Sequence, residues 1–60
     1  MFEFVVWVFD GMGRHFEKET FISFEDAFAR GWELGEDMSS EEGWYLERRI
    51  DGAFDCYMDF

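Results

Sequence analysis

A single cysteine, Cys56, rules out an intramolecular disulfide in a chain of only 60 residues. A domain of this size buries about 60% of the surface that its unfolded chain exposes, so its stability is marginal unless something adds to the core. One histidine, His15, beside one cysteine argues against a Cys/His zinc site. The remaining sources of stability are association and a rich core, and nine Phe, three Trp and two Tyr provide material for the second. We therefore expect one folded domain over residues 1–60, without a metal or another cofactor.

The charge is the second strong constraint. Fifteen Asp and Glu against five Lys and Arg give a net charge of −10 at pH 7, a field that repels phosphates, so direct nucleic-acid binding is not expected. The chain has no Pro and is 48% hydrophobic, which distinguishes it from disordered acidic segments. Little volume remains for both a core and a pocket, and the only candidates for a nucleophile and a base, His15 and Cys56, lie far apart in the sequence. We expect a protein that is not an enzyme.

The first half of the chain predicts a hairpin followed by a helix. Residues 2–9 are rich in β-branched and aromatic side chains and are apolar on both faces, as in a central strand. A turn over Asp10–Gly13 leads to a second, alternating strand over residues 15–22. Ser23 is a good N-cap for the helix, with two acids in the first turn. The apolar face of this helix consists of Phe24, Ala27, Phe28, Gly31, Trp32, Leu34, Gly35 and Met38.

The two glycines of that face are unusual in a helix. Gly31 and Gly35 each cost about 1 kcal/mol of helix propensity relative to alanine. We expect the compensation to be a close approach of the helix to a sheet crowded with aromatic rings.

The second half of the chain predicts another hairpin. After a linker, Ser39–Gly43, residues 44–51 form a third strand, Asp51-Gly52 a type I′ turn, and residues 53–60 a fourth strand. The order of elements is ββαββ. The right-handed crossover rule and the two-sided first strand then predict an α+β fold: a four-stranded antiparallel sheet in the order 2-1-3-4 with the helix packed on one face.

Carboxylates dominate the exposed side of the predicted helix and its surroundings. Residues two apart on a strand or four apart on a helix are roughly 6–7 Å apart, which is of the same order as the separation of successive phosphates. Carboxylates at this spacing can occupy the cationic groove of a DNA-binding protein, driven by the same release of counterions. The alternative is a surface that only prevents self-association. The predicted partner-binding acids are Asp26, Glu33, Glu36, Asp37, Glu41, Glu42, Asp55 and Asp59. The last two are expected on one face of the fourth strand, with Tyr57 between them.

The sheet face opposite the helix is the second candidate surface. If the even-numbered residues of the first strand meet the helix, its odd-numbered apolar residues face away from it. The resulting patch is larger than a monomer usually shows, so we predict a homodimer that buries it. An aromatic docking surface for another protein is an alternative, as is curling of the strands that makes these rings internal. The residues predicted on this face are Val5, Trp7, Phe9, Phe21 and Tyr45.

The only basic pair is Arg48-Arg49. Adjacent strand residues point to opposite faces, so the two do not form one basic patch. We expect ion pairs with nearby acids such as Glu47, Glu17 or Glu19, and the alternative is recognition of an acidic loop of a partner.

In length, acidity and layout the chain resembles the short acidic inhibitors that bacteriophages direct against host enzymes. Its hairpin, capped helix and further strand are similar to those of the phage inhibitors of uracil-DNA glycosylase, which are DNA mimics, and of bacterial RNA polymerase. The resemblance covers about 45 residues. The likeness to the polymerase inhibitor is carried by Ser23-Phe24-Glu25-Asp26-Ala27 and Gly43-Trp44-Tyr45. Arg48 and Arg49 also lie where that inhibitor has functional arginines. The strand over residues 53–60 departs from both families, so the resemblance implies a class of inhibitor and no individual site.

These observations predict an acidic inhibitor, encoded by a phage, that mimics nucleic acid and blocks the basic groove of a bacterial DNA- or RNA-binding defence or repair enzyme. The alternative is an interaction module that inhibits or adapts a host protein, such as RNA polymerase, through its aromatic sheet face, with the charge serving solubility. A structural virion protein is a third possibility. Residues 2–9 are too short to span a bilayer and lack a basic flank, so we expect no signal peptide, no membrane contact and a cytoplasmic location.

Overall fold

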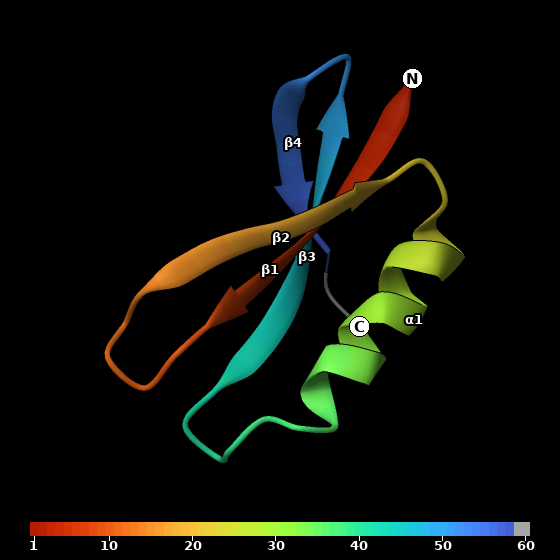
Figure 1. Ribbon diagram of the computed structural model, residues 1–60. Coiled ribbons are helices and arrows are strands. Elements are labelled where there is room, and N and C mark those ends of the chain that lie inside the picture. Colours follow the sequence, from red (N-terminus) through yellow and green to blue (C-terminus); the bar gives the residue numbers. More distant parts are fainter. Residues whose placement is uncertain (59–60) are drawn as a thin grey trace.

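The structure is a computed structural model that describes residues 1–58. Its elements are β1 (Phe2–Phe9), β2 (His15–Phe21), α1 (Phe24–Gly35), β3 (Gly43–Ile50) and β4 (Ala53–Tyr57). The four strands form one sheet in the order β2-β1-β3-β4, and all neighbouring strands are antiparallel. The helix lies across one face of this sheet (Figure 1), so the predicted ββαββ fold is confirmed.

β1 has apolar side chains on both faces and is a central strand, between β2 and β3. Residues that face each other across neighbouring strands share one side of the sheet. Val6 faces Leu46, and both belong to the core beneath α1. Val5 faces Glu47 and points away from the helix. We call these two sides the helix side and the outer face.

The core between α1 and the helix side is small. Val6, Ala27 and Leu46 form its fully buried cluster. Among the described residues, the only other buried hydrophobic side chains are Val5 and Val8. Seven partly buried side chains pack against the cluster: Phe4, Phe21, Phe24, Phe28, Leu34, Trp44 and Met58. Aromatic rings therefore supply most of the apolar packing, as the composition predicts.

α1 begins at its predicted N-cap and ends earlier than its apolar pattern. The Oγ atom of Ser23 accepts a hydrogen bond from the N–H of Asp26 at 3.5 Å. The helix stops at Gly35, and the N–H of Met38 donates to the Gly35 carbonyl in the turn that follows. The two acids after Gly35 oppose the helix dipole at its negative end, which favours termination there. Met38 therefore lies in the loop and not on the helix.

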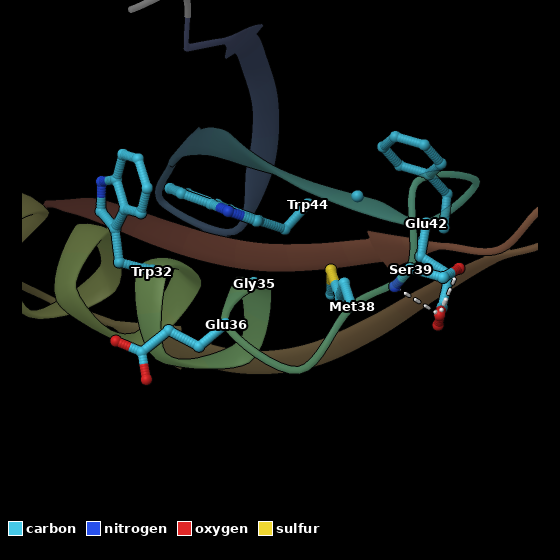
Figure 2. Close-up of a pocket in the computed structure, with 9 residues that line it drawn as sticks. Trp32, Gly35, Glu36, Met38, Ser39, Glu42 and Trp44 are labelled. Carbon is cyan, nitrogen blue, oxygen red and sulfur yellow. Dashed lines mark hydrogen bonds between the residues drawn. The ribbon is translucent and has the colours of Figure 1, made fainter.

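The indole of Trp44 explains both helix glycines. A Cβ atom at Gly31 would lie 2.2 Å from Cε3 and Cζ3 of Trp44, and one at Gly35 would lie 3.0 Å from its Nε1. The ring lies directly against the helix backbone (Figure 2). The expected close approach of helix and aromatic sheet is confirmed, and this packing offsets the loss of helix propensity.

We expect Gly31→Ala to destabilise the protein, although alanine adds about 1 kcal/mol of helix propensity. The new methyl group overlaps the Trp44 ring, which is enclosed by Phe28 and Trp32 at centroid distances of 5.8 and 6.0 Å. Overpacking of this kind outweighs the propensity gain, and a net loss of about 1–2 kcal/mol corresponds to a fall of about 8–16 °C in Tm.

Thermal unfolding followed by circular dichroism measures this effect. Gly35→Ala is the matched control, because its methyl group meets Trp44 less closely and should change Tm less. A Tm that rises in Gly31→Ala would show that the indole does not lie against the helix.

Both hairpin turns use positive φ angles. Asp51 and Gly52 have φ values of 50° and 85°, as the predicted type I′ turn requires. In the turn between β1 and β2 only Gly13 has a positive φ, of 81°. There the Oδ1 atom of Asp10 accepts backbone hydrogen bonds from Met12 and Arg14 at 2.9 and 3.0 Å. β4 ends at Tyr57, short of the predicted end at residue 60, and residues 59–60 lie outside the described part of the chain.

A bulge in β2 overturns one prediction. Lys18 has no counterpart in β1, because its two neighbours in β2 face consecutive residues of β1, Val6 and Trp7. The extra residue reverses the alternation of side chains, and Phe21 packs against the core on the helix side. The prediction that Phe21 lies on the outer face is therefore wrong.

Candidate functional site

Negative charge is concentrated in α1 and the loop between α1 and β3. Residues 25–42 contain seven acids and one base, whereas the rest of the chain has eight acids and four bases. The helix and this loop run along one side of the molecule (Figure 1). Six predicted partner-binding acids lie here and all are exposed; we call them the acidic side: Asp26, Glu33, Glu36, Asp37, Glu41 and Glu42.

Most of the bases neutralise acids elsewhere. The ion pairs are Arg14–Asp10 at 2.8 Å, Arg30–Glu19 at 2.6 Å, Arg48–Asp55 at 2.6 Å, and Arg49 with Glu17 and Glu47 at 2.9 and 3.0 Å. The acidic side receives one contact, between Arg30 and Glu33 at 3.6 Å. Within residues 1–58 its other five carboxylates have no ion-pair partner. The uncompensated charge of the protein is therefore one-sided.

The loop before β3 holds Glu42 in a fixed position. Ser39 donates from its backbone N–H and its hydroxyl to Oε1 of Glu42, at 3.0 and 2.9 Å (Figure 2). The backbone and hydroxyl hydrogen bonds hold the pKa of Glu42 below its ordinary value, so the carboxylate is ionised at neutral pH. Glu41 lies against Gly11 in the β1–β2 turn. The negative charge of Asp10 in the same turn acts to raise the pKa of Glu42, against the larger effect of the hydrogen bonds. Asp10, which pairs with Arg14, is therefore a neighbour of the acidic side and not one of its unpaired carboxylates.

A cavity of about 390 Å³ adjoins the acidic side, between the end of α1 and the start of β3. Trp32 and Trp44 line it, with Met38 and Glu42 toward its other end (Figure 2). Trp32 is 60% exposed, which is unusual for so large an apolar ring. An apolar anchor point therefore lies beside the unpaired carboxylates.

The two acids predicted in the last strand do not join this surface in the described part of the chain. The register of β4 shifts opposite Arg48 and Arg49, which leaves Asp55 as the extra residue. Its carboxylate pairs with Arg48, whose guanidinium lies 5.1 Å from the Phe2 ring centroid on the helix side. The prediction that Asp55 shares a face with Tyr57 is therefore wrong. Asp59 lies outside the described residues.

The outer face carries a buried charged network that the sequence interpretation did not anticipate as a unit. Glu47 is only 5% exposed. Its carboxylate accepts hydrogen bonds from Nε1 of Trp7 at 2.8 Å and from Arg49 at 3.0 and 3.1 Å, and Arg49 also donates to Glu17 at 2.9 Å. The hydrogen bonds from Arg49 and Trp7 hold the pKa of Glu47 below its ordinary value, although burial acts in the opposite direction. Val5, which faces Glu47, is fully buried.

The two adjacent arginines pair with acids on opposite sides of β3. Arg49 pairs with Glu17 and Glu47 on the outer face, as expected, whereas Arg48 pairs with Asp55 from the other side of the strand. The prediction that the two arginines do not form one patch is confirmed.

Four aromatic side chains line a shallow depression of about 560 Å³ on the outer face: Trp7, His15, Tyr45 and Tyr57. We call it the aromatic depression. The rings of Trp7 and Tyr45 are parallel within 2°, whereas Tyr57 stands at 83° to Tyr45 with centroids 5.5 Å apart. The Tyr45 hydroxyl lies 3.0 Å from Nδ1 of His15. Burial raises the pKa of Tyr45, so this hydroxyl stays protonated at neutral pH.

The predicted outer-face set is thus partly correct. Trp7 and Tyr45 line the depression, and the Phe9 ring lies over Gly43 and stacks with His15 at 5.7 Å. Val5 is on this face but covered. The predicted set did not include His15 and Tyr57, because His15 borders the first turn and Tyr57 was expected on a face with strand acids. The homodimer stays a prediction.

No helix among residues 1–58 is long and apolar enough to cross a membrane. In the same part of the chain, no three His, Cys, Asp or Glu side chains are grouped so as to hold a metal ion. Comparison of the chain with protein-family models, with curated proteins and with solved structures finds no match.

Proposed function

We propose that the protein is a non-enzymatic acidic inhibitor whose acidic side occupies the nucleic-acid groove of a bacterial DNA- or RNA-binding protein. The observation that carries this proposal is the one-sided distribution of unpaired carboxylates. Elsewhere, most bases hold acids in ion pairs, whereas α1 and its following loop keep their charge. A field of this shape attracts a cationic groove and orients the encounter with it.

The spacing along α1 supports mimicry of a phosphate backbone. Asp26 and Glu33 lie two turns apart on one stripe of α1, and Asp37 follows in the turn after the helix. Two helical turns rise about 11 Å, which is of the same order as two successive phosphate separations. Because the helix holds Asp26 and Glu33, little backbone entropy is lost when their carboxylates meet fixed cations.

The cavity beside the acidic side gives the same surface an apolar anchor. Interfaces draw much of their affinity from a few aromatic side chains near their centre. Trp32 is exposed next to Glu33 and Glu36, so it can pack against an apolar part of the groove while the carboxylates meet its cations.

The test is capture of bacterial proteins on the immobilised chain at low and high salt. We expect nucleic-acid-binding proteins to be retained at about 0.05 M salt and released near about 0.3 M, since screening and counterion release weaken contacts between exposed charges. Release of the same proteins by added duplex DNA would support the proposal. Retention that is insensitive to both salt and DNA would contradict it.

A second candidate function is favoured by the outer face. Phe54 and Tyr57 are 58% and 62% exposed, and their rings lie 5.0 Å apart on the last strand. An interaction module that inhibits or adapts a host protein through this face would bind in a salt-tolerant way, with a negative heat-capacity change. The capture experiment therefore separates the two candidates.

A further inference from the structure

We infer that the aromatic depression on the outer face is a binding site for an organic cation of the quaternary ammonium class. The inference does not depend on the acidic side or on the proposed inhibition of a nucleic-acid-binding protein. It depends on the four rings, the charges around them and the open shape of the depression.

The rings form a floor and walls. Tyr45 is central, with His15 5.7 Å, Tyr57 5.5 Å and Trp7 6.2 Å from it, measured between ring centroids. Tyr57 is nearly perpendicular to Tyr45 and His15 is inclined to it by 61°. A compact cation placed among such rings lies near several π faces at once, within the roughly 6 Å over which a ring quadrupole attracts charge.

The charges around the depression also favour a cation. The hydrogen-bonded network beside Trp7 contains two carboxylates, from Glu17 and Glu47, and one guanidinium, from Arg49. The network is therefore negative overall, and so is the whole protein at −10. An ammonium group with methyl substituents suits this site, because its apolar surface fits the rings and its hydration is weak.

A second copy of the chain, which the sequence predicts on this face, is the competing occupant and fits the site less well. In a twofold dimer the same surface meets itself, so the negative networks of both copies would approach each other, as would two chains of charge −10. An organic cation meets complementary charge at the same rings.

Choline and its neutral isostere 3,3-dimethyl-1-butanol provide the direct test. They have nearly the same shape and differ in the charge at the quaternary centre. Titration followed by NMR shifts and tryptophan fluorescence should give a Kd for choline on the order of 1–10 mM, at least about fivefold tighter than for the isostere. The shifts should centre on Trp7, His15, Tyr45 and Tyr57. Equal affinity for both compounds, or no binding of choline, would overturn the inference.

Variants of exposed residues locate the binding site without destabilising the protein. Tyr57→Leu removes one wall and should weaken choline binding at least about threefold, whereas Tyr57→Phe keeps the ring and should retain it. Phe54→Leu is the matched control on the same strand, since Phe54 is exposed but does not line the depression. Sedimentation at the same concentrations must show a monomer. A dimer that buries these rings, or equal loss in Phe54→Leu and Tyr57→Leu, would overturn the site.

Discussion

Replacing Arg49 with methionine should destabilise the protein by about 2–4 kcal/mol, enough to unfold much of a 60-residue domain at room temperature. Glu47 is buried, and Arg49 supplies most of the hydrogen bonds to its carboxylate. Without Arg49 the carboxylate keeps only the indole N–H of Trp7, and its charge is buried without a counterion. Urea unfolding followed by circular dichroism measures the loss.

The neighbouring arginine is the matched control for this effect. Arg48→Met breaks a pair with Asp55 whose partners are both about one-third exposed, so its cost should be below about 1 kcal/mol. Adding Glu47→Gln to Arg49→Met removes the uncompensated charge and should restore part of the stability. Equal losses in Arg48→Met and Arg49→Met would contradict the assigned role of the network.

The pH dependence of this loss follows from the pKa of Glu47. In the native protein that pKa is lowered, so the stabilisation is present above the ordinary glutamate pKa and is lost as pH falls through the folded value. In Arg49→Met, burial without a partner raises the pKa, so protonation on acidification relieves the penalty. The stability difference between the two proteins should therefore shrink between pH 7 and about pH 4.

Neutralising the acidic side should weaken target binding by about 10- to 100-fold with little loss of stability. The variant is Glu33→Gln, Glu36→Gln and Asp37→Asn together, all at exposed positions. Glu36→Gln and Asp37→Asn also remove acids that oppose the helix dipole at the end of α1, so the stability of the helix should not fall.

A matched control carries the same net charge in a different place. Thr20→Lys, Asp51→Asn and Ala53→Lys also raise the net charge by three, at exposed positions away from the acidic side. Affinity for the captured target, measured by isothermal titration calorimetry, should fall much less in this control. Equal losses in both variants would show that only net charge matters, and not its placement.

The arrangement of elements was predictable because local signals agreed with each other. Ser23 as an N-cap, Asp51-Gly52 as a type I′ turn and a central strand apolar on both faces all appear in the structure as expected. The glycines of α1 were also informative, since their cost in propensity indicated the close contact with Trp44.

The errors arose where one extra residue changes which way a strand faces. Bulges at Lys18 and Asp55 leave no mark in the hydrophobic pattern, and each reverses the alternation for the residues that follow. Phe21 and Asp55 were misplaced for this reason. The network around Glu47 was missed for a different reason: it combines residues of three strands, which only tertiary structure brings together.

A competition titration on a captured target tests the central claim most directly. Labelled duplex DNA is bound to that protein, and the wild-type chain or the neutralised variant is then added. Mimicry predicts that the wild-type chain displaces the DNA completely and that its apparent inhibition constant rises with DNA concentration. The variant should displace the DNA only at about 10- to 100-fold higher concentration. A ternary complex in which DNA and the wild-type chain bind together, with unchanged affinity for DNA, would contradict the account.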